Sequence, residues 1–123
     1  MTGIVLLVED NAVNRMIGSE MLKSFGVDVV EAEDGVQALA LLEQQRVDLV
    51  LMDIQMPVLD GYAATRRARE RENKLRLPRV PIVALTANAF DEDAVQAIAA
   101  GMDAHLAKPY SREQLRELVR RWL

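Results

Sequence analysis

The stretch Leu49–Tyr62, LVLMDIQMPVLDGY, combines an apolar run with an acidic residue at its end. Its first four residues are continuously apolar, which is typical of a parallel strand that helices cover on both faces. The run then ends in a carboxylate, Asp53, where a turn residue would be expected. The function therefore depends on which other polar side chains lie near Asp53.

Similar apolar runs recur along the chain and predict further strands. They are rich in Val, Ile and Leu and do not alternate with polar residues, and they cover Ile4–Val8, Val27–Val30, Val80–Leu85 and, more weakly, Ala104–Ala107. Together with the run that begins at Leu49, the sequence predicts five buried parallel strands.

Helices are predicted between these runs, because apolar residues there repeat every three or four positions. The apolar stripes are Val13-Ile17-Met21-Phe25, Ala38-Leu39-Leu42 and Leu115-Leu118-Val119-Trp122, and the segments Tyr62–Asn73 and Asp93–Ala100 complete the series. Helix starts are indicated by N-cap residues and by one capping box, at Asp34, Asp60, Asp91 and Ser111 with Gln114.

Strand and helix thus alternate five times with short connections. This pattern implies right-handed crossovers and helices on both faces of a sheet. Five strands are too few for a closed (β/α) barrel, so the sequence predicts an α/β fold with an open, doubly wound parallel sheet. The length of 123 residues fits one domain over residues 1–123.

Composition excludes several classes of function. The 15 basic and 19 acidic residues give a net charge of −4, which argues against direct binding of nucleic acid. The basic runs Arg66–Arg71 and Arg120-Arg121 are interpreted as solvated helix faces. Cysteine is absent, so disulfides and thiolate chemistry are excluded. No apolar run approaches the ~20 residues that span a bilayer, so we expect no membrane contact by this domain.

Polar side chains follow the other predicted strands as well. The first strand ends in Glu9-Asp10, the fourth in Thr86 and the fifth in Lys108-Pro109. In open parallel sheets the functional site lies at the carboxyl ends of the strands, so we expect these residues to gather around Asp53.

The chemistry of this set points to a phosphoryl group. Three carboxylates at one edge would repel one another unless a cation lies among them. Oxygen ligands near solvent suit Mg²⁺, with Mn²⁺ as a substitute. Lys108 adds a fixed cation and Thr86 a hydroxyl donor, which are groups that bind phosphoryl oxygens. A carboxylate in such a setting, here Asp53, is a competent nucleophile for an acyl phosphate.

The motifs of rival functions on the same architecture are missing. The sequence contains no G-x-x-x-x-G-K-[ST], no G-x-G-x-x-G and no G-x-S-x-G. Their absence disfavours nucleotide binding, dinucleotide binding and hydrolase chemistry of the Ser-nucleophile type.

Four segments carry a resemblance to a known family. VEDNAVNR, LMDIQMPVLDGYAATRRAR and VPIVALTANA, the last followed by GMDAHLAKPY, resemble in order and spacing the receiver domain of two-component response regulators. The resemblance covers essentially the whole chain and is greatest to the receiver modules of hybrid sensor histidine kinases. It implies a flavodoxin-like three-layer sandwich with strand order 2-1-3-4-5.

The resemblance also implies a role for each position. Asp53 would be the phosphoacceptor, and Thr86 and Lys108 would hold phosphoryl oxygens. Mg²⁺ would be bound by Asp10, Asp53 and the backbone carbonyl of Gln55, with assistance from Glu9. The Lys108-Pro109 peptide bond would be cis, an arrangement largely confined to proline.

Other positions are implied to shape or tune the site. The loop after the acceptor would be shaped by Met56, Pro57, Asp60 and Gly61. Gln55 and Asn88 occupy positions that tune the lifetime of the phosphoryl group. His105 stands where the family often has Tyr or Phe as a rotamer switch coupled to Thr86, so it is either a second switch residue or a partly exposed strand residue.

The implied function is a phosphorelay signalling domain. Its partner would be a histidine kinase or a histidine phosphotransfer domain, and phosphorylation would drive a conformational switch and, in some settings, a dimer. The domain would dephosphorylate itself slowly and would not be an enzyme on its own. We expect a cytoplasmic location, as a stand-alone receiver or as part of a larger hybrid kinase in the membrane.

Two alternatives stay open. An aspartate-nucleophile phosphohydrolase would be expected to have a second acidic residue two positions after Asp53, and Gln55 occupies that position. A pseudo-receiver that binds partners without phosphorylation would be expected to have lost Asp10, Asp53 or Lys108, and all three are present.

Overall fold

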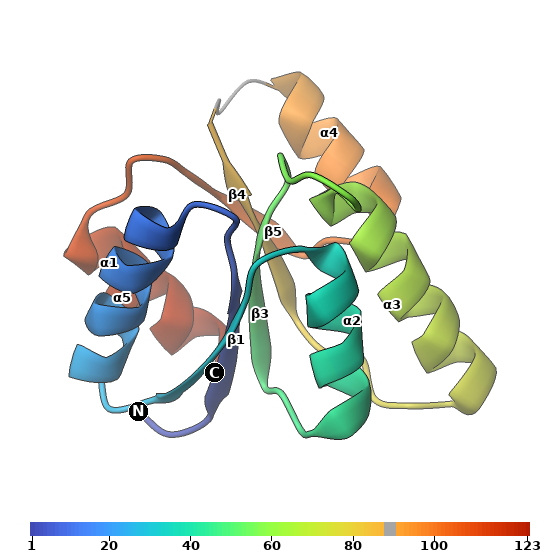
Figure 1. Cartoon of the computed structure of the whole chain (residues 1–123), viewed down its shortest axis with the longest axis horizontal. Coiled ribbons are helices and arrows are strands. Elements are labelled where there is room, and N and C mark those ends of the chain that lie inside the picture. The colour runs from blue at the N-terminus through green and yellow to red at the C-terminus, as the bar shows by residue number, and fades with distance from the viewer. Residues whose placement is uncertain (88–90) are drawn as a thin grey trace.

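The structure, a computed structural model, describes residues 1–87 and 91–123, without the side chains of residues 91–94. Strands and helices alternate in this part of the chain (Figure 1). The strands are β1 (Ile4–Val8), β2 (Asp28–Ala32), β3 (Leu49–Asp53), β4 (Ile82–Thr86) and β5 (Ala104–Ala107). The helices are α1 (Ala12–Ser24), α2 (Gly35–Gln44), α3 (Gly61–Leu75), α4 (Asp91–Ala100) and α5 (Arg112–Trp122).

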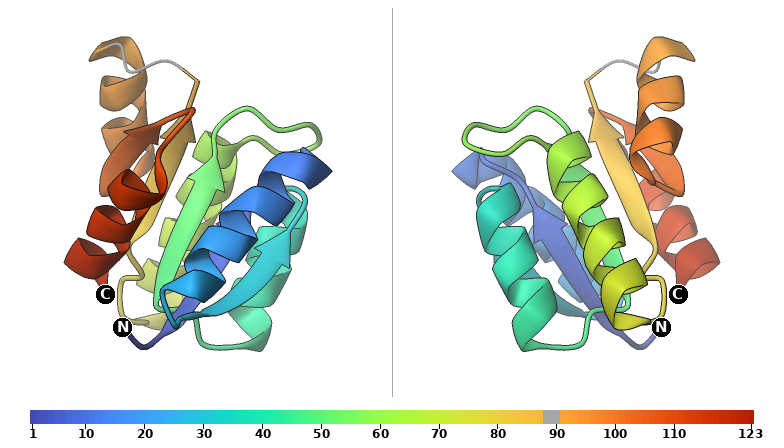
Figure 2. Two further views of the ribbon diagram at one scale, coloured as in Figure 1. Left: turned by 90° about the vertical axis from the view of Figure 1, so that its left-hand side faces the viewer. Right: turned by 90° about the vertical axis from the view of Figure 1, so that its right-hand side faces the viewer.

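The strands form one sheet in the order β2-β1-β3-β4-β5 within the described residues. Every neighbouring pair is parallel, with Val5 opposite Leu49 and Asp53 opposite Leu85. Helices α1 and α5 cover one face of the sheet, and α2, α3 and α4 cover the other (Figures 1 and 2). The predicted doubly wound α/β fold and its strand order are confirmed.

Strands β1, β2, β3 and β4 each contribute side chains to two cores, because successive residues of a strand point to opposite faces, whereas β5 contributes to the core of α1 and α5 alone. On β1, Val5 and Leu7 pack toward α1 and α5, whereas Leu6 and Val8 pack toward α2, α3 and α4. All four side chains are buried. Burying such a side chain contributes roughly 1.5–3 kcal/mol, so the continuous apolar runs stabilise both layers of helices.

The predicted apolar stripe of α1 is wrong in its first half. Val13 and Ile17 are 59% and 46% exposed, while the buried positions of α1 are Gly18, Ser19 and Leu22. Only Met21 and Phe25 of the stripe pack against the core. The reason is the close approach at Gly18, where an added Cβ would lie 3.0 Å from Leu7 Cδ2. The small residues face the sheet, and the apolar ones turn outward.

Helix starts follow the predicted capping pattern. Asp34 and Asp60 accept hydrogen bonds from backbone amides of α2 and α3, and Ser111 forms the capping box with Gln114. Asn11, which the sequence reading did not identify, caps α1 by accepting from Asn14 N at 2.9 Å. The side chain of the predicted cap Asp91 lies outside the described residues.

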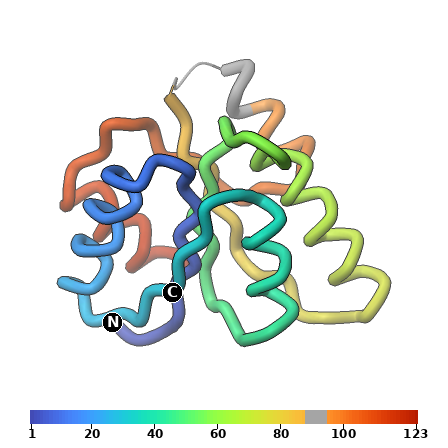
Figure 3. The backbone as a smooth tube through the Cα atoms, viewed as in Figure 1, coloured from blue at the N-terminus to red at the C-terminus, as the bar shows by residue number. Residues whose placement is uncertain are grey.

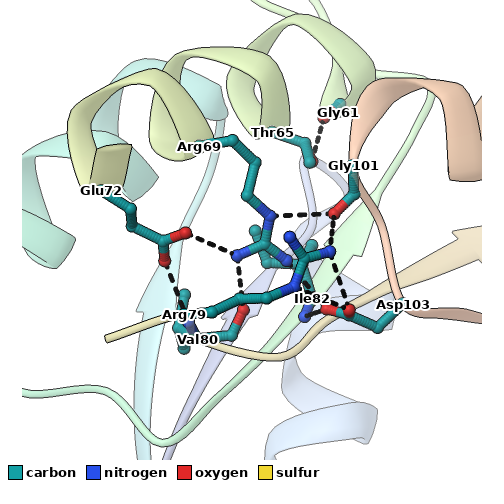
Figure 4. A network of polar contacts seen from close by, with 9 residues as sticks. All are labelled: Gly61, Thr65, Arg69, Glu72, Arg79, Val80, Ile82, Gly101 and Asp103. Carbon is teal, nitrogen blue, oxygen red and sulfur yellow. Dashed lines mark hydrogen bonds and ion pairs between the residues drawn. The ribbon is translucent and has the colours of Figure 1, made fainter. Parts of the chain in front are cut away.

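A buried ion network corrects the interpretation of the first basic run. Arg69 on α3 is not solvated, because its side chain is only 10% exposed and binds Glu72 and Asp103 at 2.9 and 2.8 Å (Figure 4). It also donates to the carbonyls of Gly101 and Val80. The network thereby ties α3 to the end of α4 and to the segments that enter β4 and β5, at what we call the amino edge of the sheet.

The two chain ends also lie at the amino edge of the sheet, near the bottom of the view in Figure 3. They are side by side, since a Cβ added to Gly3 would lie 3.1 Å from Leu123 Cδ2. Among the described residues, none of the helices combines the length and the apolar character that crossing a bilayer requires.

Candidate phosphoryl-transfer site

Asp53 is the last residue of β3 and lies at the carboxyl edge of the sheet. The residue is 6% exposed, and its Oδ1 accepts a hydrogen bond of 3.0 Å from the Gln55 amide. Gly61 at the start of α3 lies directly behind it, because an added Cβ there would overlap the Asp53 carbonyl oxygen. The strand end and the helix start thus hold Asp53 between them.

Lys108 reaches Asp53 from the end of β5. Its Nζ lies 3.1 Å from Asp53 Oδ2 and 2.9 and 3.0 Å from the two carboxylate oxygens of Glu9. Glu9, at the end of β1, is 3% exposed. One ammonium therefore joins two carboxylates, Glu9 and Asp53, that are 44 positions apart in the sequence and lie at the ends of different strands.

Burial shifts the protonation of this group. The pKa of Glu9 is raised from 4.5 to about 7, first because burial disfavours its charged form, next because of its hydrogen bond with Asp53. Lys108 opposes that shift. Burial alone would lower the pKa of Lys108, but the hydrogen bonds to Glu9 and Asp53 outweigh it and raise that pKa. Lys108 is therefore a permanent cation of the site.

The carboxylates fit a divalent cation. Oxygens of Glu9, Asp10 and Asp53 all lie within 4.8 Å of one another. Asp10 is exposed, which leaves a side open to water, and Mg²⁺ characteristically keeps several water ligands. Even with Glu9 protonated, two carboxylates against one ammonium leave an excess of negative charge that a hard divalent ion neutralises.

Thr86 ends β4 next to this group, and it is fully buried. Its backbone carbonyl accepts a hydrogen bond from the Lys108 amide, which fixes the two strand ends to each other. The Thr86 hydroxyl has no hydrogen-bond partner among the described residues. A buried donor without a partner costs free energy, which makes Thr86 ready to donate to an acceptor that arrives at this edge.

Comparisons with known proteins point to one family. The sequence profile of the response regulator receiver domain matches residues 5–120. This chain belongs to the response regulator receiver domains. It is 42% identical over 98% of its length to hybrid signal transduction histidine kinase L of Dictyostelium discoideum, and 41% identical over 96% to sensor protein GacS of Pseudomonas syringae. It spans only 7% and 13% of those two proteins.

Solved receiver domains have the same fold. The receiver domain of sensor histidine kinase PA1611 from Pseudomonas aeruginosa, with magnesium in its active-site cleft, is 48% identical with a TM-score of 0.87, covering 99% of this chain and 98% of that one. The receiver domain of Saccharomyces cerevisiae Ssk1, crystallised with the histidine phosphotransfer protein Ypd1, is 30% identical with a TM-score of 0.95, covering 98% of this chain and 88% of that one.

The remaining predicted residues of this receiver domain are placed as follows. Gln55 is exposed and follows Asp53 in the loop toward α3. The Lys108-Pro109 bond is cis, as the resemblance implied. His105 is exposed on β5 opposite Ala84, so its role as a switch stays a prediction. Asn88 lies outside the described residues.

Two side chains that lie beside Lys108 and Glu9 were not predicted from the sequence. Tyr110 lines a groove of about 390 Å³ beside Lys108, together with Ile17 and Asn14 of α1. Arg15 donates to the carbonyl of Glu9 at 2.9 Å. Arg15 ends the segment VEDNAVNR and Tyr110 ends the segment GMDAHLAKPY. Both segments resemble the receiver family, and this resemblance is the sequence feature from which the two residues could have been predicted.

Proposed function

We propose that residues 1–123 form one receiver domain that accepts a phosphoryl group on Asp53 from a phosphohistidine of a partner protein. The observation that carries the proposal is the position of Asp53, a nearly buried carboxylate held between the Lys108 ammonium and the Gln55 amide. A carboxylate in this position is oriented for in-line attack on a phosphorus atom.

The chain supplies most of the catalysis through fixed charges and donors. Lys108 binds phosphoryl oxygens and neutralises the charge that develops on them, and Thr86 adds a hydrogen bond. Mg²⁺, held by Asp10, Asp53 and the backbone carbonyl of Gln55 with Glu9 nearby, supplies further charge neutralisation when bound. Mn²⁺ fits the same oxygens. Water later attacks the aspartyl phosphate, so the domain dephosphorylates itself slowly.

Phosphorylation then shifts a conformational equilibrium. A phosphoryl group favours one state only through contacts that it makes better in that state. The buried Thr86 hydroxyl, which lacks a partner among the described residues, and Lys108 provide such contacts. We expect the surface of α4, β5 and α5 to change, with His105 on β5 as a reporter, and a dimer to form through it where phosphorylation drives assembly.

The partner contacts the exposed apolar side chains of α1. Val13, Met16 and Ile17 are 59%, 58% and 46% exposed, and Ile17 lines the groove beside Lys108. A protein that delivers a phosphoryl group to Asp53 must rest on surface near the carboxyl edge, and this apolar surface is adjacent to it. Ssk1, a relative of this chain, is paired with a histidine phosphotransfer protein. A histidine kinase or a phosphotransfer domain is the proposed partner here.

The similarity to hybrid kinases supports a parent protein of that kind, with this domain on the cytoplasmic side and without direct contact to nucleic acid or membrane. The receiver would then be a substrate of the phosphorelay and not a turnover enzyme. The phosphohydrolase alternative is distinguished by measuring phosphate release, and the pseudo-receiver alternative by measuring partner binding.

The test compares phosphate release from acetyl phosphate with release from p-nitrophenyl phosphate. A receiver takes up about one phosphoryl group per chain and releases phosphate slowly, and p-nitrophenyl phosphate is hardly hydrolysed. Steady hydrolysis of p-nitrophenyl phosphate would instead establish a phosphohydrolase. Absence of any phosphoryl uptake, together with equal binding of a histidine phosphotransfer partner by the wild type and by Asp53→Ala, would establish a pseudo-receiver.

A further inference from the structure

Arg15 on α1 makes contacts that the phosphoryl-transfer chemistry does not use. Its side chain is only 16% exposed, and Nη1 donates to the backbone carbonyl of Glu9 at 2.9 Å. Nε lies 3.5 Å from Glu31, and Nη2 lies 3.7 Å from Glu33, on either side of the end of β2. One guanidinium thus joins the end of β1 to the end of β2.

These contacts fix the backbone of Glu9 on both sides. The Glu9 amide donates to the carbonyl of Ala32 at 3.1 Å, and the Glu9 carbonyl accepts from Arg15. The Glu9 carbonyl and the Asp10 amide belong to one planar peptide unit. The bond from Arg15 therefore fixes the direction in which the chain enters Asp10.

Asp10 depends on this backbone for its position. Its carboxylate is exposed and makes no hydrogen bond or ion pair with any part of the chain that the structure describes. By contrast, the carboxylates of Glu9 and Asp53 are both held by Lys108. Of the three acidic groups, Asp10 is the one whose side chain has no anchor of its own.

We propose that Arg15 is a positioning residue for the divalent cation, which acts by holding the peptide between Glu9 and Asp10 so that the Asp10 carboxylate faces Asp53. The inference rests on the proposed function, because it assumes that Mg²⁺ binds there. Arg15 does not act through its charge, since a cation beside the site repels Mg²⁺ and Glu31 and Glu33 lie against it. If Arg15 acts by positioning Asp10, its removal weakens Mg²⁺ binding. If its positive charge mattered more, its removal would strengthen Mg²⁺ binding.

The experiment measures the Mg²⁺ dissociation constant by calorimetric titration for the wild type, Arg15→Met and Arg15→Lys. We expect Arg15→Met to bind about tenfold more weakly, as is usual when a residue that orients a metal ligand is lost. Arg15→Lys keeps one donor for the Glu9 carbonyl and should recover part of the affinity. Amide hydrogen exchange at residues 9 and 10 should accelerate in Arg15→Met, while exchange in β3 stays unchanged.

The matched control is Arg112→Met, which removes an exposed arginine that donates to Ser24 and lies over the Phe25 ring. It should leave the Mg²⁺ affinity unchanged. Equal or tighter binding by Arg15→Met, or equal weakening by Arg112→Met, would overturn the role of Arg15 and leave the proposed function intact. Absence of Mg²⁺ binding by the wild type would overturn the proposed function, and the inference with it.

Discussion

Lys108 is the residue that joins two carboxylates of the site. It lies within 3.1 Å of carboxylate oxygens from both Glu9 and Asp53, and both carboxylates are nearly buried. Removing one partner of a buried ion pair is costly because the remaining charge has no counter-ion. We therefore expect Lys108 to be important to stability as well as to the proposed phosphoryl transfer.

Replacement of Lys108 by Met should lower the free energy of unfolding by about 3 kcal/mol in the presence of a chelator. Mg²⁺ should restore part of this loss, because it replaces the missing cation, and the variant should bind Mg²⁺ more tightly than the wild type. Urea unfolding with and without Mg²⁺ measures both effects. Lys23→Met, at an exposed position of α1, is the control; equal losses in the two variants would contradict the account.

Glu9 makes stability depend on pH. Because its pKa is raised from 4.5 to about 7, the folded protein binds more protons than the unfolded chain in this window. Its contribution is fully present below pH 4.5 and is lost as the pH rises toward 7. In chelator, urea unfolding of the wild type should show this decline, and Glu9→Gln should not. Parallel pH profiles for the two proteins would contradict this assignment.

Among the elements, β1, β3, β4 and β5 show what the sequence could predict. Parallel strands appear in the sequence as apolar runs, continuous in β1, β3 and β4 and interrupted by the exposed His105 in β5. The residue at the end of each run lies at the carboxyl edge, so the places of Asp53, Thr86 and Lys108 were predictable. Helix α1 shows the limit. Its inward face consists of Gly18, Ser19 and Leu22, and two small residues give no hydrophobic signal against the outward Val13 and Ile17.

The junction of β3 and α3 depends on Gly61. Replacement by Ala would force a Cβ against the backbone of Asp53 and Ile54, which cannot move without displacing the Asp53 carboxylate. We expect a loss of about 2 kcal/mol in unfolding free energy, measured by urea titration, and slower phosphorylation. Gly18→Ala is the control, since its Cβ meets only the side chains of Leu7 and Tyr110 at 3.0 Å, which can shift. A larger loss for Gly18→Ala would contradict this reading.

In the molecule as a whole, the two edges of the sheet hold different groups of charged residues. The carboxyl edge holds the acidic group and Lys108, and the amino edge holds the ion network of Arg69 (Figure 4). That network could not be predicted from the sequence, because Arg69 and its partner Asp103 are separated by 34 positions and only the fold brings them together. A run of basic residues gives no sign of which member is buried.

Arg69→Met should therefore destabilise the molecule without altering its chemistry. We expect the free energy of unfolding to fall by about 3 kcal/mol, because Glu72 and Asp103 would lose their buried counter-ion, while Mg²⁺ affinity stays unchanged. Urea unfolding and calorimetry measure the two quantities. Arg66→Met, at an exposed position of the same helix, should change neither. A weakened Mg²⁺ affinity in Arg69→Met would mean that the two edges are coupled.

The central claim is that Asp53 accepts a phosphoryl group in a reaction that needs Mg²⁺. The most direct measurement is the intact mass of the protein after exposure to acetyl phosphate, with Mg²⁺ or with a chelator, for the wild type and for Asp53→Asn. We expect a single phosphoryl adduct on the wild type with Mg²⁺, and none with the chelator or on Asp53→Asn. An adduct that persists in Asp53→Asn or in chelator, or no adduct while a known receiver is labelled in parallel, would contradict it.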